Sequence, residues 1–123
     1  MRVPILKQSQ YVIASIQSAL SDEELLQLRD DLAHDVGKYR SRGVIIDVTV
    51  LDVMDSFAVR TLRAIAHMIR LRGAATVIVG IQPDVAFAMV QLGLTLEGIP
   101  TALDLEEGLA CLNHKVSGAR HVQ

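Results

Sequence analysis

The stretch that most constrains the fold is residues 43–72, because its hydrophobic pattern changes period part-way along. Residues 44–46 (Val-Ile-Ile) form a continuous apolar and β-branched run, which is typical of a strand covered by helices on both faces. From Phe57 onward, apolar residues recur at the spacing of an α-helix. They are Ala58, Leu62, Ile65 and Ile69. We therefore predict a buried strand followed by an amphipathic helix.

Asp55 and Ser56 lie where this helix is predicted to begin. The first turn of a helix has backbone N–H groups without an intrahelical partner, and the aligned peptide dipoles place partial positive charge there. A phosphoryl group on Ser56 would meet those donors and that charge, so the position suits a modified serine. Asp and Ser are also the commonest helix N-caps, which explains the pair without any modification. The two roles are compatible, and this stretch alone does not separate them.

The chain before this stretch is predicted to form a hairpin and a helix. Residues 3–7 and 11–17 are two short apolar runs that indicate paired strands. Ser21 and Glu24 have the spacing of a capping box, which predicts a helix start. Gly43 is expected to end this helix. Its predicted buried stripe is Leu25, Leu28, Leu32, Val36 and Tyr39.

Two further strand–helix units are predicted after residue 72. Residues 75–79 form a β-rich run, and Pro83 suits the first turn of the following helix because it lacks an N–H group. The predicted inner side of that helix is Val85, Ala86, Met89 and Val90, before Gly93 ends it. Residues 99–103 predict a weak edge strand. Asp104 and Glu107 then repeat the capping pattern. The last helix is expected to run through Leu109, Leu112 and Val116.

The predicted order of elements is β-β-α-β-α-β-α-β-α, which is typical of an α/β protein with a mostly parallel sheet. We expect a mixed sheet of four to five strands packed with four helices. One domain over residues 1–116 accounts for this pattern, followed by a flexible C-terminal tail over residues 117–123. A chain of 123 residues can bury a hydrophobic core without disulfides or a structural metal.

Charge and cysteine content exclude several classes of function. A net charge of −2 gives no general attraction to nucleic acid or to an anionic membrane. A basic stripe on the helix after Ser56 is expected to be a solvated face or a protein contact; it comprises Arg60, Arg63, His67 and Arg70. Cys111 is the only cysteine, so we expect a small buried hydrophobe and no intrachain disulfide. With no apolar stretch of membrane-spanning length and no signal-peptide core, we expect a cytoplasmic protein.

The residues that usually carry enzyme chemistry do not form a convincing set. Asp47, Asp52 and Asp55 could suggest magnesium binding or a phosphoaccepting aspartate, but a receiver domain would begin with β-α and not with β-β. Asp47 is more simply explained as a residue that bonds neighbouring backbone. The histidines are far apart in the chain, at positions 34, 67, 114 and 121. We therefore predict no catalytic activity, no metal and no cofactor.

The Asp55-Ser56 junction, the β-β-α opening and residues 80–86 (Gly-Ile-Gln-Pro-Asp-Val-Ala) together resemble the STAS family, the anti-sigma-factor-antagonist-like domains. The resemblance covers residues 3–116. Within the family, the pattern is similar to the stand-alone stressosome scaffolds of the RsbS type. Its further parts are Val-Ile-Ile-Asp-Val-Thr and Met-Asp-Ser-Phe around the junction, and later Leu-Gly and Thr-Ala-Leu-Asp-Leu-Glu.

This resemblance implies a scaffold that is itself the substrate of a kinase. Such proteins co-assemble with RsbR-type STAS proteins and sequester an RsbT-type serine/threonine kinase. The kinase phosphorylates the serine that matches Ser56 and leaves, and an RsbX-type phosphatase resets the system. The residues expected to flank the phosphorylation site and contact partners are Asp52, Asp55, Phe57 and Arg60.

Two other functions stay open at this point. A sporulation-type anti-sigma-factor antagonist, which binds an anti-sigma kinase and frees a sigma factor, would have the same fold. Phe57 argues against it, since many such proteins have Asp-Ser-Ser-Gly at this junction. A module that binds a small ligand or a nucleotide through the loop after the central strand is the other alternative, but the glycine-rich cradle for phosphates is missing.

Overall fold

Strands and helices follow one another in the order that the sequence predicts. The computed structural model describes the backbone of residues 2–121 and the side chains of residues 2–116. The strands are β1 (Ile5–Gln8), β2 (Tyr11–Ser15), β3 (Gly43–Asp47), β4 (Ala75–Val79) and β5 (Thr101–Ala102). The helices are α1 (Asp22–Tyr39), α2 (Ser56–Leu71), α3 (Pro83–Gln91) and α4 (Leu105–His121).

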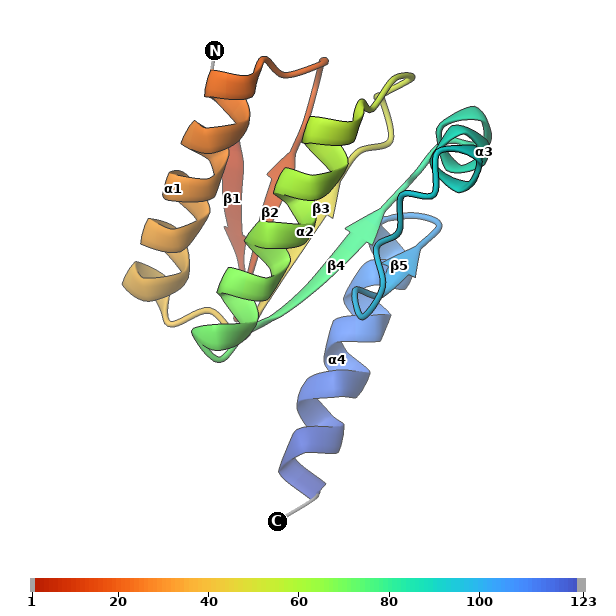
Figure 1. Cartoon of the computed structure of the whole chain (residues 1–123). Coiled ribbons are helices and arrows are strands. Elements are labelled where there is room, and N and C mark those ends of the chain that lie inside the picture. Colours follow the sequence, from red (N-terminus) through yellow and green to blue (C-terminus); the bar gives the residue numbers. More distant parts are fainter. Residues whose placement is uncertain (1, 122–123) are drawn as a thin grey trace.

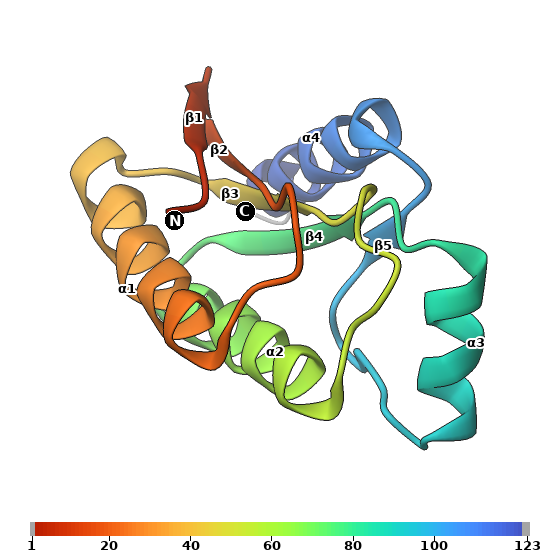
Figure 2. The same cartoon turned by 90° about the horizontal axis from the view of Figure 1, so that it is seen from above.

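The strands form one sheet in the order β1-β2-β3-β4-β5. β1 pairs with β2 in antiparallel orientation, and all other neighbours are parallel, which confirms the mixed, mostly parallel sheet. Figures 1 and 2 show α1 and α2 side by side on one face of the sheet, α4 on the other face, and α3 beyond the edge near β4 and β5. The carboxyl ends of β2, β3 and β4 therefore lie at the same end of the sheet, where the loops into α1, α2 and α3 begin.

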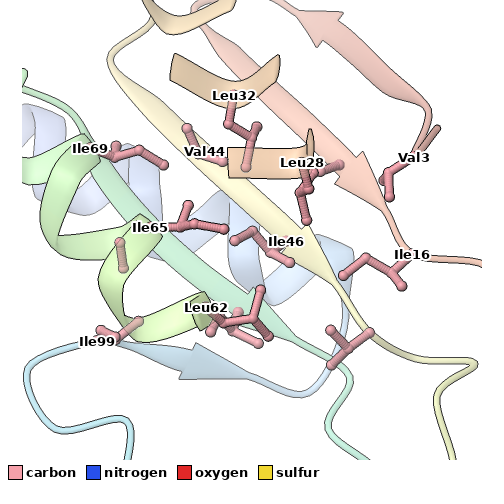
Figure 3. Close-up of a cluster of buried hydrophobic side chains, with 14 of the residues drawn as sticks. Val3, Ile16, Leu28, Leu32, Val44, Ile46, Leu62, Ile65, Ile69 and Ile99 are labelled. Atoms are coloured by element: carbon pink, nitrogen blue, oxygen red, sulfur yellow. The ribbon is translucent and has the colours of Figure 1, made fainter. Parts of the chain in front are cut away.

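The side chains of β3 alternate between two hydrophobic cores, because successive residues of a strand point to opposite faces. Val44 and Ile46 belong to the larger core beneath α1 and α2, where Ile65 lies close by (Figure 3). Ile45 belongs to the smaller core beneath α4, together with Leu112. All of these side chains are fully buried. The continuous apolar run in the sequence is thus explained by helices on both faces.

The predicted helix starts at residues 21, 83 and 104 are confirmed. Ser21 Oγ accepts a hydrogen bond from the Glu24 N–H at 3.1 Å, and the Glu24 carboxylate accepts one from the Ser21 N–H at 2.9 Å. Pro83 is the first residue of α3. Asp104 Oδ1 accepts from the Glu107 N–H at 2.9 Å, so the last helix also begins with a side-chain cap. The caps at residues 21 and 104 each join residues three positions apart, and Pro83 acts through its own ring and missing N–H, so all three signals are local in the chain.

Three side chains predicted to face inward are exposed. Tyr39 is in the last position of α1 and lies near two ammonium groups, with the Lys38 Nζ 5.2 Å and the Lys7 Nζ 5.9 Å from its ring centre. In α3, Ala86 and Val90 face solvent, because this helix lies beyond the sheet edge and buries only two of its side chains. Helical spacing predicts the direction of a buried stripe and does not predict its width.

Gly43 begins β3, as expected of the central strand, but the prediction that it ends α1 is wrong. The helix ends at Tyr39, and Arg40 takes the left-handed conformation (φ 49°, ψ 46°) that terminates it. A Cβ atom at position 43 would lie 2.9 Å from the Leu112 Cδ2 atom. The glycine therefore lets α4 pack closely on the sheet.

Helix α4 is longer and Cys111 less buried than predicted. The α4 backbone is helical to His121, five residues beyond Val116, so part of the predicted tail is helical; residues 122–123 lie outside the described part of the chain. Cys111 is partly buried and packs at the edge of the smaller core. The helix has only the sheet on one side, so a side chain away from its central line stays partly accessible.

Candidate functional site

Asp55 and Ser56 have separate roles at the start of α2. Asp55 is the N-cap in an extended conformation, and its Oδ1 atom accepts a hydrogen bond from the Ala58 N–H at 2.8 Å. Ser56 is the first residue of the helix and is half-buried. Within the described part of the chain, no hydrogen bond engages the Ser56 hydroxyl. Because Asp55 supplies the cap, the serine side chain is not needed for it.

The loop between β3 and α2 presents a mixed apolar and acidic surface. Leu51 and Met54 are buried and anchor the loop, and the Leu51 N–H donates to the Val48 carbonyl at 2.9 Å. The side chains of Val50 and Val53 are 54% and 65% exposed. We call this part of the molecule the Ser56 surface. It comprises Val50, Asp52, Val53, Asp55, Ser56, Phe57 and Arg60.

The predicted partner-contacting residues are all at this surface, with different exposure. Asp52, Asp55 and Arg60 are exposed, whereas Phe57 is half-buried. Arg60 is four residues after Ser56 in the same helix, so the two side chains share a face. The predicted residues therefore lie within one short segment, from the end of the β3–α2 loop to the first turns of α2.

A hollow of about 70 Å³ adjoins the Asp55 cap. Its walls are mostly apolar and come from the β2–α1 loop, the β3–α2 loop and the first turns of α1 and α2. They include Ile16, Leu20, Leu25, Val53, Met54 and Ala58. The Ser56 surface is thus next to a small apolar depression as well as to carboxylates.

The β3–α2 loop is held by the segment that follows β4. The Gln82 Nε2 atom donates to the Thr49 carbonyl at 2.8 Å. Gly80 has φ +81°, and a Cβ atom there would clash with the Thr49 Oγ1 atom. The Asp47 Oδ1 atom accepts from the Thr49 N–H at 2.9 Å and from its hydroxyl. Asp47 thus bonds the neighbouring backbone, as predicted, and Gly80 and Gln82 position the loop before Ser56.

The basic stripe of α2 is partly used within the fold. The Arg63 Nη1 atom donates to the Thr95 carbonyl at 2.9 Å, and the Arg70 Nη2 atom donates to the Gly98 carbonyl at 2.8 Å. Both side chains tie the segment after α3 to α2. Arg60 and His67 are exposed and have no such bond within residues 2–116.

Sequence patterns did not indicate Val50, Val53, Thr49 or Gln82 as parts of this site. Hydrophobicity alone would have placed Val50 and Val53 inside the protein. They are exposed because the loop is anchored by other residues, Leu51 and Met54. The Asp-x-Thr spacing of residues 47 and 49 is a signal for an Asx turn. The contact of Gln82 with Thr49 has no local signal, since 33 residues separate them.

The described residues show neither a metal-binding cluster nor a membrane-spanning helix. In residues 2–116, no group of three or more His, Cys, Asp or Glu side chains is placed to hold a metal ion. Among the described residues, no helix has the length and apolar content required to cross a membrane.

Comparison with known proteins identifies the family. A model of the STAS domain matches residues 3–108. The chain belongs to the STAS family. Among solved structures, a serine-to-glutamate variant of RsbS from Moorella thermoacetica is 35% identical to it, with a TM-score of 0.81 over 94% of this chain and 97% of that chain. The predicted STAS resemblance and the fold are therefore confirmed.

Two other similar proteins are a chain of the stressosome and an RsbT co-antagonist. A chain in a structure of the molecular architecture of the stressosome is 34% identical, with a TM-score of 0.76 over 92% of this chain and 98% of that chain. The RsbT co-antagonist protein RsbRA of Bacillus subtilis (strain 168) is 28% identical over 97 residues, which are 79% of this chain and 35% of that protein. The chain spans about a third of the length of the curated relatives it matches.

Proposed function

We propose that this STAS domain is a non-enzymatic stressosome scaffold that sequesters an RsbT-type serine/threonine kinase and releases it when Ser56 is phosphorylated. It co-assembles with RsbR-type STAS proteins in the cytoplasm, and an RsbX-type phosphatase removes the phosphate. It is then a negative regulator of a general stress-signalling pathway. The observation that carries this proposal is the half-buried hydroxyl of Ser56, which begins α2 without capping it.

The relatives support the stressosome branch of the family. Two solved structures that are more than 30% identical to the chain come from RsbS and from the stressosome, and the match covers nearly their whole length. A relative named as an RsbT co-antagonist supports the choice of kinase. No feature of the site specifically favours a sporulation-type antagonist.

The electrostatics of the Ser56 surface support release by phosphorylation. A phosphate adds up to about two negative charges, and backbone N–H groups at the start of α2 without an intrahelical partner can donate hydrogen bonds to it without unfolding the helix. Asp52 and Asp55 are exposed beside it, so the same charge strengthens an acidic surface and repels a kinase docked there. A coupling of about 1 to 3 kcal/mol would lower kinase affinity roughly 5- to 150-fold.

Helix α3 supports co-assembly with other STAS domains. Large apolar side chains on and after this helix are exposed, at Phe87 (64%), Val90 (76%) and Leu92 (64%). A hollow of about 490 Å³ lies between α3 and β5, and Leu103, which is 78% exposed, lines it. Contiguous exposed apolar surface is typical of protein–protein contacts. We assign this α3 surface to the neighbouring RsbR-type subunit.

The proposal is tested with the full chain, an RsbT-type kinase and ATP. We expect one phosphorylated residue, Ser56, by mass spectrometry. In a pull-down with ATP, Ser56→Ala should retain the kinase after the unsubstituted chain has released it. Ser56→Asp should fold normally and bind less kinase even without ATP.

The matched control is Ser18, an exposed serine in the β2–α1 loop at the same end of the molecule. Ser18→Ala and Ser18→Asp should behave like the unsubstituted chain. Phosphorylation at Ser18 in place of Ser56, or equal kinase retention by Ser56→Ala and Ser56→Asp, would refute the proposed function.

A further inference from the structure

A third hollow is lined by residues from the second half of α2, the first half of β4, the segment before β5 and helix α4. It is thus away from the Ser56 surface, because Ser56 begins α2. Its volume is about 330 Å³, which is in the range of small-molecule sites. Its apolar wall includes Ala66, Ile99 and Val116, and its cationic side chains are Arg42, Arg70 and Lys115. We call it the β4-edge hollow.

The hollow exists because β5 is short. β5 pairs only with Ile78 and Val79, so the first half of β4 has no strand neighbour on that side. In a parallel sheet, alternate residues direct their backbone groups to the same neighbour. The Ile78 N–H donates to the Pro100 carbonyl across this edge at 3.1 Å, so the Thr76 N–H points to the same edge, at the hollow.

Thr76 also has an unpartnered side chain in this wall. The residue is only 6% exposed, and its Oγ1 atom is the one buried side-chain polar atom without a hydrogen-bond partner in the part of the chain whose side chains are described. Buried polar atoms are nearly always hydrogen-bonded, so this hydroxyl requires a partner that the described residues do not supply. The wall therefore has a hydroxyl and an N–H group available to a ligand.

The charge of the hollow specifies the kind of ligand. No Asp or Glu is among its lining residues. Arg70 is held by its bond to the Gly98 carbonyl, whereas Arg42 and Lys115 form no ion pair within residues 2–116. In a chain with net charge −2, three cations without a carboxylate are a local excess of positive charge. Cationic side chains that line one hollow match the charge of a phosphate group.

We propose that the β4-edge hollow binds a small organic phosphate. Arg42, Lys115 and the Thr76 hydroxyl hold the phosphate group, and the apolar part of the ligand packs against Ile99 and Val116. The site is independent of Ser56 phosphorylation, so this inference stands or falls separately from the proposed function.

Phenyl phosphate is a suitable probe because it combines one phosphate group with one apolar ring. At constant ionic strength, titration into the full chain should give saturable amide NMR shifts centred on Thr76, Ile99 and Lys115. Inorganic phosphate should bind at least about fivefold more weakly, since it cannot use the apolar wall, and uncharged phenol should not saturate.

Variants decide whether the hollow is the site. Arg42→Gln and Lys115→Gln should each weaken phenyl phosphate binding about fivefold or more, and Thr76→Val should weaken it while the fold stays intact. Lys38→Gln removes a cation at the end of α1, outside the hollow, and should change nothing. Equal affinity of Arg42→Gln and Lys38→Gln, unchanged affinity of Thr76→Val, or shifts scattered over all basic residues would overturn the proposal.

Discussion

At the start of α2, Asp55 stabilises the helix, whereas Ser56 is the proposed phosphorylation site. Asp55 caps the helix through its carboxylate, whereas the Ser56 hydroxyl forms no bond that the fold requires. Asp55→Ala should therefore lower the free energy of unfolding by about 1 kcal/mol, and Ser56→Ala should change it by less than about 0.5 kcal/mol. Urea unfolding of the purified variants measures both values.

Asp55→Asn is the matched control, because an asparagine oxygen can accept the same hydrogen bond from the Ala58 N–H. Its stability should stay close to that of the unsubstituted chain. If Asp55→Asn were as unstable as Asp55→Ala, the negative charge would matter more than the cap. If Ser56→Ala were the less stable of the two alanine variants, the assignment of roles would be reversed.

Gly80 shows how one residue supports a loop that is distant in sequence. Its backbone is in a region that favours glycine, and a Cβ atom would meet the Thr49 side chain. Gly80→Ala should cost about 2 to 5 kcal/mol, from backbone strain together with the clash. Gly93→Ala should cost only about 1 to 2 kcal/mol, since Gly93 also has a positive φ but no atom within 4 Å of the added Cβ. Thermal unfolding of both variants compares them, and equal losses would exclude the clash.

Among the helices, α3 is short and contributes little to the core. It buries Val85 and Met89 and leaves Phe87 and Val90 in solvent. Phe87→Asn should change the free energy of unfolding by less than about 0.5 kcal/mol but reduce co-assembly with an RsbR-type STAS domain, measured by size-exclusion chromatography.

Val85→Ala supplies the opposite control for the α3 surface. Val85 is buried, so this variant should lose about 1 to 3 kcal/mol of stability, yet it should still co-assemble at a temperature where it is folded. Loss of assembly in Val85→Ala with full assembly in Phe87→Asn would place the contact elsewhere.

At the scale of the whole molecule, the sheet is covered unequally. Two helices pack on one face, and α4 alone covers the other (Figure 2). Leu112 is a fully buried side chain of α4, so Leu112→Ala should cost about 2 to 5 kcal/mol. Leu103→Ala, at a side chain that is 78% exposed, should cost less than about 0.5 kcal/mol. Chemical denaturation distinguishes them, and a small loss for Leu112→Ala would mean that α4 is not essential to the core.

The sequence by itself determined the order of elements, the helix starts and the position of Ser56 at one of them. Caps such as Ser21 with Glu24 join residues three positions apart, and a buried strand has a continuous apolar run, so these signals are local in the chain. The family resemblance rests on the same local segments.

Only the tertiary structure decided which surfaces remain open. Gln82 reaches Thr49 and Gly80 packs against it because β3 and β4 are neighbours in the sheet, which no local pattern specifies. The exposure of Val90 and the unpaired edge at Thr76 follow from a short β5 and from α3 lying beyond that edge. Local spacing determines where an element begins and which way it faces, whereas burial depends on what packs against it from distant parts of the chain.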